Sequence, residues 1–182
     1  MKIIEEPNVI DDHLLDILGS EFHFNHEKGL AEWIKNSADA YIREGVSDQK
    51  QFVIIRLTDS KKPTSIECID FVGMTADEIQ TAFKRWGDPE AAKRGLKKKV
   101  YGGHGNGGKF YMRQMFKESY FMTYKNGKMN IYGFSTNRKY GFAKGMKDVS
   151  ISPTEAIKIA GIDNCISDEI KQKILHGKTG FT

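Results

Sequence analysis

The sequence predicts an α/β or α+β sandwich, in which helices cover one face of a sheet. Residues 27–44 carry apolar side chains at the spacing of a long amphipathic helix. Two strand-like runs, at 51–58 and 65–72, come next along the chain. In residues 120–134, apolar and polar side chains alternate on both sides of an Asn-Gly pair, which is the pattern of a β-hairpin. Helices and strands in this order are typical of a domain with two packed layers.

Caps and glycines define the remaining elements. Thr75 and Glu78 form a capping box at the start of one helix, and a Ser and a Gly bracket each of the two last helices. Residues 87–108 are basic and rich in glycine, which predicts a long loop that acts as a lid. The other expected elements are helices at 11–19, 75–86, 110–116, 152–161 and 167–177, and a strand that begins at 178–182.

Length and composition favour one soluble domain. The chain has 182 residues, of which 39% are hydrophobic, and this is enough to bury a core. No apolar run approaches the roughly 20 residues of a membrane helix, and the N-terminus is acidic where a signal peptide is basic. Cys68 and Cys165 alone exclude a disulfide scaffold and a four-thiolate zinc site. We expect one cytoplasmic domain over 1–182, which is a fragment of a longer protein because its last residues begin a strand.

Positive charge is concentrated in the middle of the chain. Residues 84–147 hold sixteen Lys or Arg against three acids, whereas the whole chain has a net charge of +4. Such a region suggests an anionic partner, although a solvated basic surface gives the same pattern. Interleaved aromatic residues allow an alternative function, a nucleic-acid-binding module that acts on DNA, unless these rings belong to the core. The rings in question are Tyr101, Phe110, Tyr111, Tyr120 and Tyr124.

Five glycines within residues 102–108 form a candidate phosphate site. Backbone N–H groups in such a stretch can converge on phosphate oxygens because no Cβ blocks the approach. Neither common phosphate motif is complete, because no buried strand precedes the glycines and Phe110 replaces the hydroxyl residue of a P-loop. Lys109 and the start of a helix follow the glycines, which favours a phosphate cradle over a flexible linker.

Two further segments carry polar groups suited to a nucleotide. One stripe of the long helix places a Glu and an Asn one turn apart, where they can hold a water and a Mg²⁺ ion; a solvent-exposed helix face is the alternative. Asp70 ends an apolar strand and can accept a hydrogen bond from a ligand amine, while Gly73 lets a flat ring approach. An ordinary strand-to-helix turn would look the same. The stripe consists of Glu32, Asn36, Asp39 and Arg43.

In this order, three segments resemble the boxes of the GHKL superfamily, the Bergerat-fold ATPases. Residues 31–41 are similar to the N box, E-x-x-x-N-[SA]-x-D-A, and residues 69–75 to the first glycine box. Residues 102–110 resemble the lid glycine box in its MORC-like form, G-x-x-G-N-G-x-K. The superfamily includes gyrase B subunits, MutL, ninety-kilodalton heat-shock chaperones and histidine kinases. The resemblance implies a Bergerat-type fold, with a mixed, mostly antiparallel sheet and a glycine-rich lid.

The resemblance also implies a Mg²⁺-dependent ATPase whose activity is weak in this fragment, with ATP closing the lid and driving self-dimerisation of a larger protein. Glu32 would be the general base that activates the attacking water. Asn36 would ligate Mg²⁺, Asp39 would support the site, and Ala40 would pack near the base. These residues all belong to the segment that resembles the N box.

The other two boxes would bind the adenine ring and the phosphates. Asp70 would accept from the adenine amino group, with Gly73 and Met74 lining the ring. This box is one residue shorter than usual, and Val72 stands near the place of a glycine. The superfamily also has a late Thr near the adenine, for which Thr179 and Thr182 are both candidates. The residues expected around the phosphates are Gly103, Gly105, Asn106, Gly107, Gly108 and Lys109, the last at the terminal phosphate.

Overall fold

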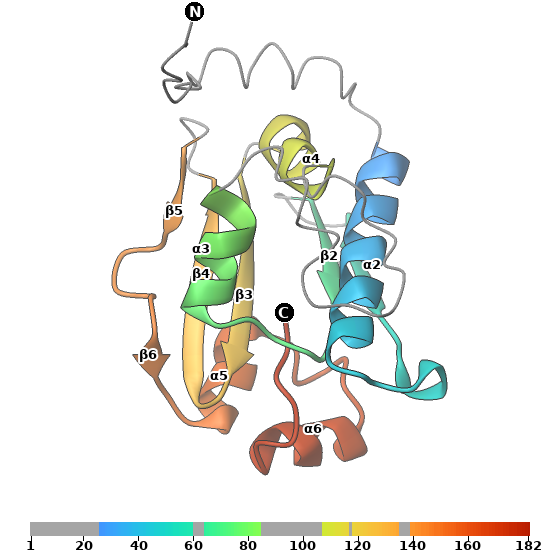
Figure 1. The fold of residues 1–182 in the computed structure, drawn as a ribbon, viewed down its shortest axis with the longest axis vertical. Coiled ribbons are helices and arrows are strands. Elements are labelled where there is room, and N and C mark those ends of the chain that lie inside the picture. Colours follow the sequence, from blue (N-terminus) through green and yellow to red (C-terminus); the bar gives the residue numbers. More distant parts are fainter. Residues whose placement is uncertain (1–25, 60–63, 85–106, 117, 135–138) are drawn as a thin grey trace, which may run out of the picture.

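A computed structural model describes residues 26–59, 64–84, 107–116, 118–134 and 139–182 (Figure 1). The helix expected at 11–19 and most of the loop expected at 87–108 lie outside these residues. The helices of the described part are α2 (His26–Arg43), α3 (Ala76–Lys84), α4 (Gly107–Met115), α5 (Pro153–Ala160) and α6 (Asp168–Leu175), with a 3₁₀ turn, η1, at Asp48–Lys50. The strands are β1 (Ile54–Thr58), β2 (Ser65–Ile69), β3 (Ser119–Lys125), β4 (Lys128–Phe134), β5 (Tyr140–Phe142) and β6 (Val149–Ser150).

The strands form two antiparallel groups. β1 pairs with β2, and β3 pairs with β4, which also pairs with both β5 and β6. The β3–β4 hairpin turns at Asn126 and Gly127, whose φ angles of 53° and 74° are both positive. A two-residue turn of this kind matches the twist of the flanking strands, and Asn-Gly is the pair that adopts it most readily. The predicted hairpin is therefore confirmed.

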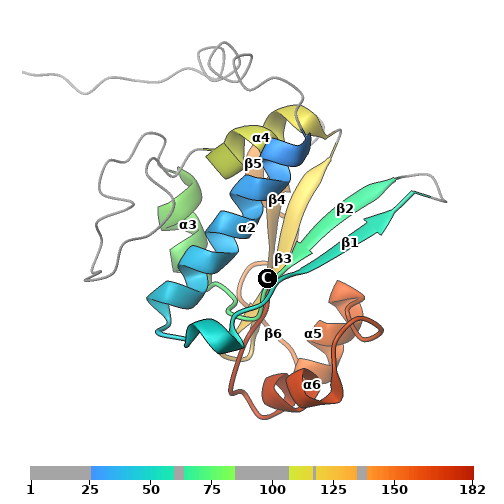
Figure 2. The same ribbon diagram turned by 90° about the vertical axis from the view of Figure 1, so that its right-hand side faces the viewer.

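The last residues of the chain join the two groups of strands. Phe181 pairs with Tyr124 of β3 through two backbone hydrogen bonds of 2.9 and 3.0 Å. On its other side, Thr182 pairs with Asp70, just beyond β2, through two bonds of 2.9 and 3.0 Å. Figure 2 shows the end of the chain at the point where β2 and β3 converge. The extended segment predicted at 178–182 is thus a bridge that holds both sheets together.

Helices pack on both faces of these strands. Side chains alternate between the faces of a strand, so Phe121 and Tyr124 of β3 point in opposite directions. Phe121 faces the helix α3, where its ring lies 4.9 Å from that of Phe83. Tyr124 belongs instead to a buried cluster with Ile157 of α5 and Ile174 of α6. The predicted α+β arrangement is confirmed, but helices cover both faces rather than the one expected: α2, α3 and α4 lie on one side of the strands, and α5 and α6 close the core from the other (Figure 2).

Most of the predicted elements are present in the described residues, with small differences at their ends. The long helix, both strand runs, the capped helix at α3 and the two last helices are confirmed. The capping box is formed, because Thr75 Oγ1 accepts from Glu78 N at 3.2 Å and Glu78 Oε2 accepts from Thr75 N at 2.7 Å. The predicted loop is wrong at Gly107 and Gly108, which form the first turn of α4. The strands β5 and β6 have no counterpart among the predicted elements, because strands of three and two residues are too short to show alternation.

The bridge formed by residues 178–182 predicts that Phe181→Ala strongly lowers the stability of the fold. The Phe181 side chain is 1% exposed and stacks on Tyr124 with ring centroids 5.8 Å apart. Its truncation should lower the free energy of unfolding by about 3–5 kcal/mol, measured by chemical denaturation. Tyr120→Ala, which removes an aromatic ring that is 57% exposed, is the matched control and should cost less than about 1 kcal/mol. Equal effects of the two substitutions would contradict the role of the bridge.

Candidate functional site

Two glycines let the start of α4 approach α2 closely. A Cβ at Gly107 would lie 2.6 Å from Glu32 Oε2, and a Cβ at Gly108 would lie 2.6 Å from Asn36 Nδ2. Any larger residue would displace these two side chains. The N-terminus of α4, where the helix dipole favours negative charge, therefore lies beside Glu32 and Asn36. The structure thus brings together the end of the predicted glycine loop and the predicted polar stripe.

The polar stripe of α2 has one buried member, Asp39, between the exposed Asn36 and Arg43. Glu32 Oε1 accepts from Lys35 Nζ at 2.8 Å, and this partly exposed ion pair raises the pKa of Lys35. Asn36 is exposed, whereas Asp39 is buried. A buried Asp39 does not fit an ordinary solvent-exposed helix face. Ala40 is half-buried, in keeping with a packing position.

Asp70 is a buried acid held by hydrogen bonds. Its Oδ2 accepts from Ser37 Oγ at 2.9 Å, and its Oδ1 accepts from Val72 N at 3.1 Å. Burial raises the pKa of Asp70 to about 6, against the hydrogen bonds from Ser37 and the backbone, which lower it. The sequence analysis gave Ser37 no role. The only available signal was its place next to Asn36 on the helix, which does not show that its side chain faces β2.

The residues after Asp70 are fixed by threonines. Met74 N donates to Thr123 Oγ1 at 2.6 Å, and Thr123 Oγ1 lies 3.0 Å from Thr182 Oγ1. Thr182 therefore lies beside both Asp70 and Thr123, whereas the Thr179 hydroxyl donates to the Phe71 carbonyl. Thr123 is fully buried and was not singled out in the sequence. Thr182 is therefore the late Thr that lies beside Asp70, the acid expected to contact adenine.

The backbone conformation and close packing at position 73 require glycine. Its φ is +79°, and a Cβ there would collide with the Tyr124 carbonyl oxygen. Residues with a side chain rarely adopt this φ, so glycine is required for the chain to turn out of β2. The missing side chain leaves room for a neighbouring strand. Access for a flat ring, the reason expected from the sequence, is a separate matter that this contact does not address.

Lys109 lies apart from the other candidate residues. Its side chain is buried, and its Nζ donates to the carbonyl of Ala82 in the last turn of α3 at 2.9 Å. A cation is favourable at this end of a helix. Gly103, Gly105 and Asn106 lie outside the described residues, so Gly107 and Gly108 alone represent the loop at this site.

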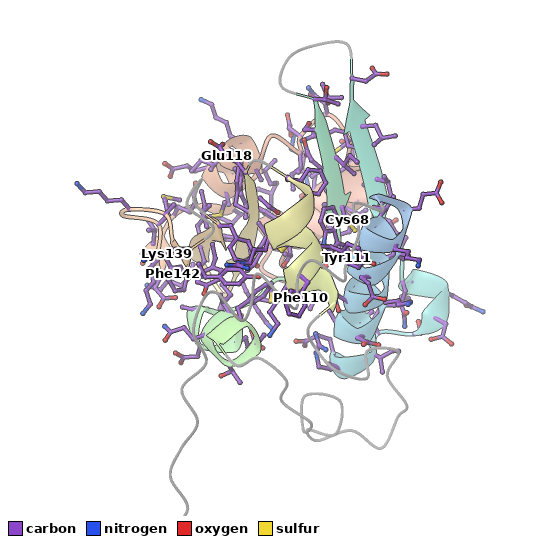
Figure 3. The ribbon with its side chains drawn as sticks, turned by 90° about the horizontal axis from the view of Figure 1, so that it is seen from above. Cys68, Phe110, Tyr111, Glu118, Lys139 and Phe142 are labelled. Carbon is purple, nitrogen blue, oxygen red and sulfur yellow. The ribbon has the colours of Figure 1, made fainter. Side chains whose placement is uncertain are left out.

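The aromatic residues of the basic region are mostly part of the core. Phe110, Tyr111 and Tyr124 are buried, while Tyr120 is exposed and Tyr101 lies outside the described residues. Figure 3 shows Phe110 and Tyr111 on α4, with Tyr111 directed toward α2 and Cys68. Buried rings cannot stack on bases, so the core interpretation of these three residues holds rather than a nucleic-acid platform.

Two negative findings concern the described part of the chain. Among these residues, no group of three His, Cys, Asp or Glu side chains is placed to hold a metal ion. The same residues include no helix that is both long and apolar enough to cross a membrane.

Comparison with known proteins identifies a family. The model for histidine kinase-, DNA gyrase B- and HSP90-like ATPases matches residues 24–171. The match spans α2 through the first half of α6 and includes Glu32, Asn36, Asp70 and the start of α4. A search of curated proteins gave no match.

The buried Asp70 leads to a prediction about stability and pH. Its pKa of about 6 in the folded protein exceeds the ordinary value of 3.8, so its contribution to stability is present at low pH and is lost as the pH rises through about 6. Asp70→Asn should therefore raise the free energy of unfolding at about pH 7.5 by about 1–2 kcal/mol, and the gain should vanish near pH 4.

Denaturant unfolding at both pH values measures this difference. Asp59→Asn removes an exposed acid and serves as the control that should change stability little at either pH. No gain for Asp70→Asn at the higher pH would show that burial does not penalise the Asp70 carboxylate.

Proposed function

The chain belongs to the family of histidine kinase-, DNA gyrase B- and HSP90-like ATPases, and we propose that it binds MgATP between α2, α4 and the end of β2. Membership in this family identifies an ATP-binding module of the ATPase type with a Bergerat-like α+β fold. The assignment of individual residues, the dependence on Mg²⁺ and the consequences of hydrolysis are our proposals.

One observation carries the proposed phosphate site, namely the approach of Gly107 and Gly108 to Glu32 and Asn36. A phosphate at the N-terminus of α4 would meet the positive end of a helix. It would then also lie beside a carboxylate and an amide on α2. Gly103, Gly105 and Asn106 complete this phosphate loop in our proposal, on the basis of the resemblance alone.

The residues at this site fit a magnesium ion that is bound together with phosphates. Such an ion takes most of its ligands from phosphate and water oxygens and needs only one or two from the protein. Asn36 lies beside the α4 N-terminus with its Nδ2 toward Gly108, and its amide oxygen would be the Mg²⁺ ligand, with Asp39 supporting it from the buried side. When bound, Mg²⁺ would neutralise part of the phosphate charge.

Glu32 is the proposed general base. Its carboxylate would take a proton from water while the water oxygen bonds to the terminal phosphorus, and the bond from that phosphorus to the ADP oxygen breaks. Lys35 holds one carboxylate oxygen, Oε1, while Oε2 lies toward Gly107. Ala40 would pack nearby. Lys109 would reach the terminal phosphate only after leaving the Ala82 carbonyl, so its proposed contact requires a change in side-chain position.

The proposed adenine site lies where α2 contacts the end of β2, next to Ser37. Asp70 would accept from the adenine amino group, with Thr182 beside it and Gly73 and Met74 along the ring. Following the resemblance, residues 87–106 would form a nucleotide-gated lid. ATP binding would then drive conformational change or dimerisation of a larger protein.

Separate substitutions on α2 test this division of roles. Glu32→Ala should leave ATP binding nearly intact and lower hydrolysis by roughly 10²–10⁴-fold, because the base acts in the transition state. Asn36→Ala should lower both Mg²⁺-dependent affinity and turnover, because a metal ligand also serves ground-state binding. Nucleotide titration and phosphate release are the two measurements.

Glu27→Ala is the control, because it removes an exposed carboxylate from the first turn of the same helix. It should change neither quantity by more than about twofold. Unchanged turnover in Glu32→Ala would remove the catalytic role and leave a nucleotide-binding domain without this mechanism.

A further inference from the structure

Ser37 connects α2, which carries the proposed phosphate site, to Asp70 of the proposed adenine site. Its side chain is buried, and its Oγ donates to Asp70 Oδ2 at 2.9 Å. Asn36, the preceding residue, lies toward α4 instead. The N box pattern accepts either Ser or Ala at the position of Ser37, so the resemblance gives this hydroxyl no role.

Ser37 is the one side chain, among the residues that the structure describes, that donates a hydrogen bond to the Asp70 carboxylate. The Asp70 Oδ1 atom accepts from the backbone of Val72. The remaining titratable or charged groups that face Asp70 are Tyr41 and Arg43 of α2 and Cys68 of β2. None of these three forms a hydrogen bond or an ion pair with Asp70. The backbones of Val72 and Gly73 also favour the ionised form of Asp70, and the Ser37 hydrogen bond contributes most among these groups.

We propose that Ser37 is a positioning residue that sets a preference for adenine over guanine nucleotides, by orienting Asp70 and keeping it in its carboxylate form. The proposal rests on the proposed ATP site. A carboxylate accepts from the exocyclic amine of adenine, whereas a protonated acid can donate to a ring carbonyl such as that of guanine. The Ser37 hydroxyl donates to Oδ2 and so stabilises the carboxylate.

Asp70 changes between its protonated form and its carboxylate form near neutral pH. Burial raises the pKa of Asp70 to about 6, and the Ser37 hydrogen bond limits this rise. Without the hydroxyl the acid would keep its proton at higher pH, and the fraction able to accept from adenine would fall at pH 7. A loss of ATP affinity that recovers at higher pH is therefore the signature of this role.

The experiment compares MgATP and MgGTP affinities of wild type and Ser37→Ala by calorimetric titration at about pH 7 and pH 8.5. At pH 7, Ser37→Ala should bind MgATP roughly tenfold more weakly, whereas its MgGTP affinity should stay the same or rise, because more of Asp70 carries a proton. Much of the loss should be recovered at pH 8.5. Ser37→Thr, which keeps a hydroxyl, should retain the wild-type ratio of the two affinities.

Tyr41→Phe is the matched control. The Tyr41 hydroxyl also ties α2 to the end of β2, because it accepts from Phe71 N at 2.9 Å and donates to the Phe52 carbonyl at 2.8 Å. Its removal loosens the same contact without taking a hydrogen bond from Asp70. Tyr41→Phe should therefore leave the ratio of MgATP to MgGTP affinity and its pH dependence unchanged.

Each outcome bears on the proposal. The same ratio in Ser37→Ala and wild type, or the same change in Ser37→Ala and Tyr41→Phe, would overturn the role of Ser37 while leaving ATP binding in place. No MgATP binding by wild type would overturn both this inference and the proposed function. If Ser37→Ala does not fold, Ser37→Cys makes the same comparison, because a thiol is a weak donor of similar size.

Discussion

The backbone pairing of the last residues with both sheets is the constraint on which the rest of the structure depends. Phe181 and Thr182 lie between Tyr124 of β3 and Asp70 beyond β2, so this one segment sets the distance between the two groups of strands. Glycine at 73 and 180 makes the fit possible, since a Cβ at either position would collide with the Tyr124 carbonyl oxygen. The position of Asp70, and therefore of the proposed adenine site, follows from this pairing.

The helix α2 distributes its side chains between two partners. Toward α4 it presents Glu32 and Asn36, where glycine allows the close approach of another helix. Toward the end of β2 it presents Ser37 and Tyr41, which bond to Asp70 and to the Phe71 backbone. A single rigid element therefore spans both ends of the proposed nucleotide site. This explains how the proposed phosphate chemistry and base recognition can share one helix.

Local features of the fold could be predicted from the sequence, and long-range side-chain contacts could not. The Thr75–Glu78 capping box and the Asn-Gly turn act within a few residues, so their signals are complete in the sequence. The pattern of the polar stripe likewise indicated Glu32 and Asn36 as neighbours. The bond from Ser37 to Asp70, the burial of Thr123 and the contact of Lys109 with the α3 carbonyl depend on packing between distant segments. No spacing along the chain encodes those contacts.

The central claim is that MgATP binds between α2, α4 and the end of β2, and calorimetric titration of the wild-type chain with MgATP tests it most directly. The account predicts saturable binding at one site and a rise in melting temperature. At a hundredfold excess of nucleotide over Kd, the stabilisation would be about 2.7 kcal/mol. A folded chain that shows neither binding nor a shift at millimolar MgATP would contradict the account.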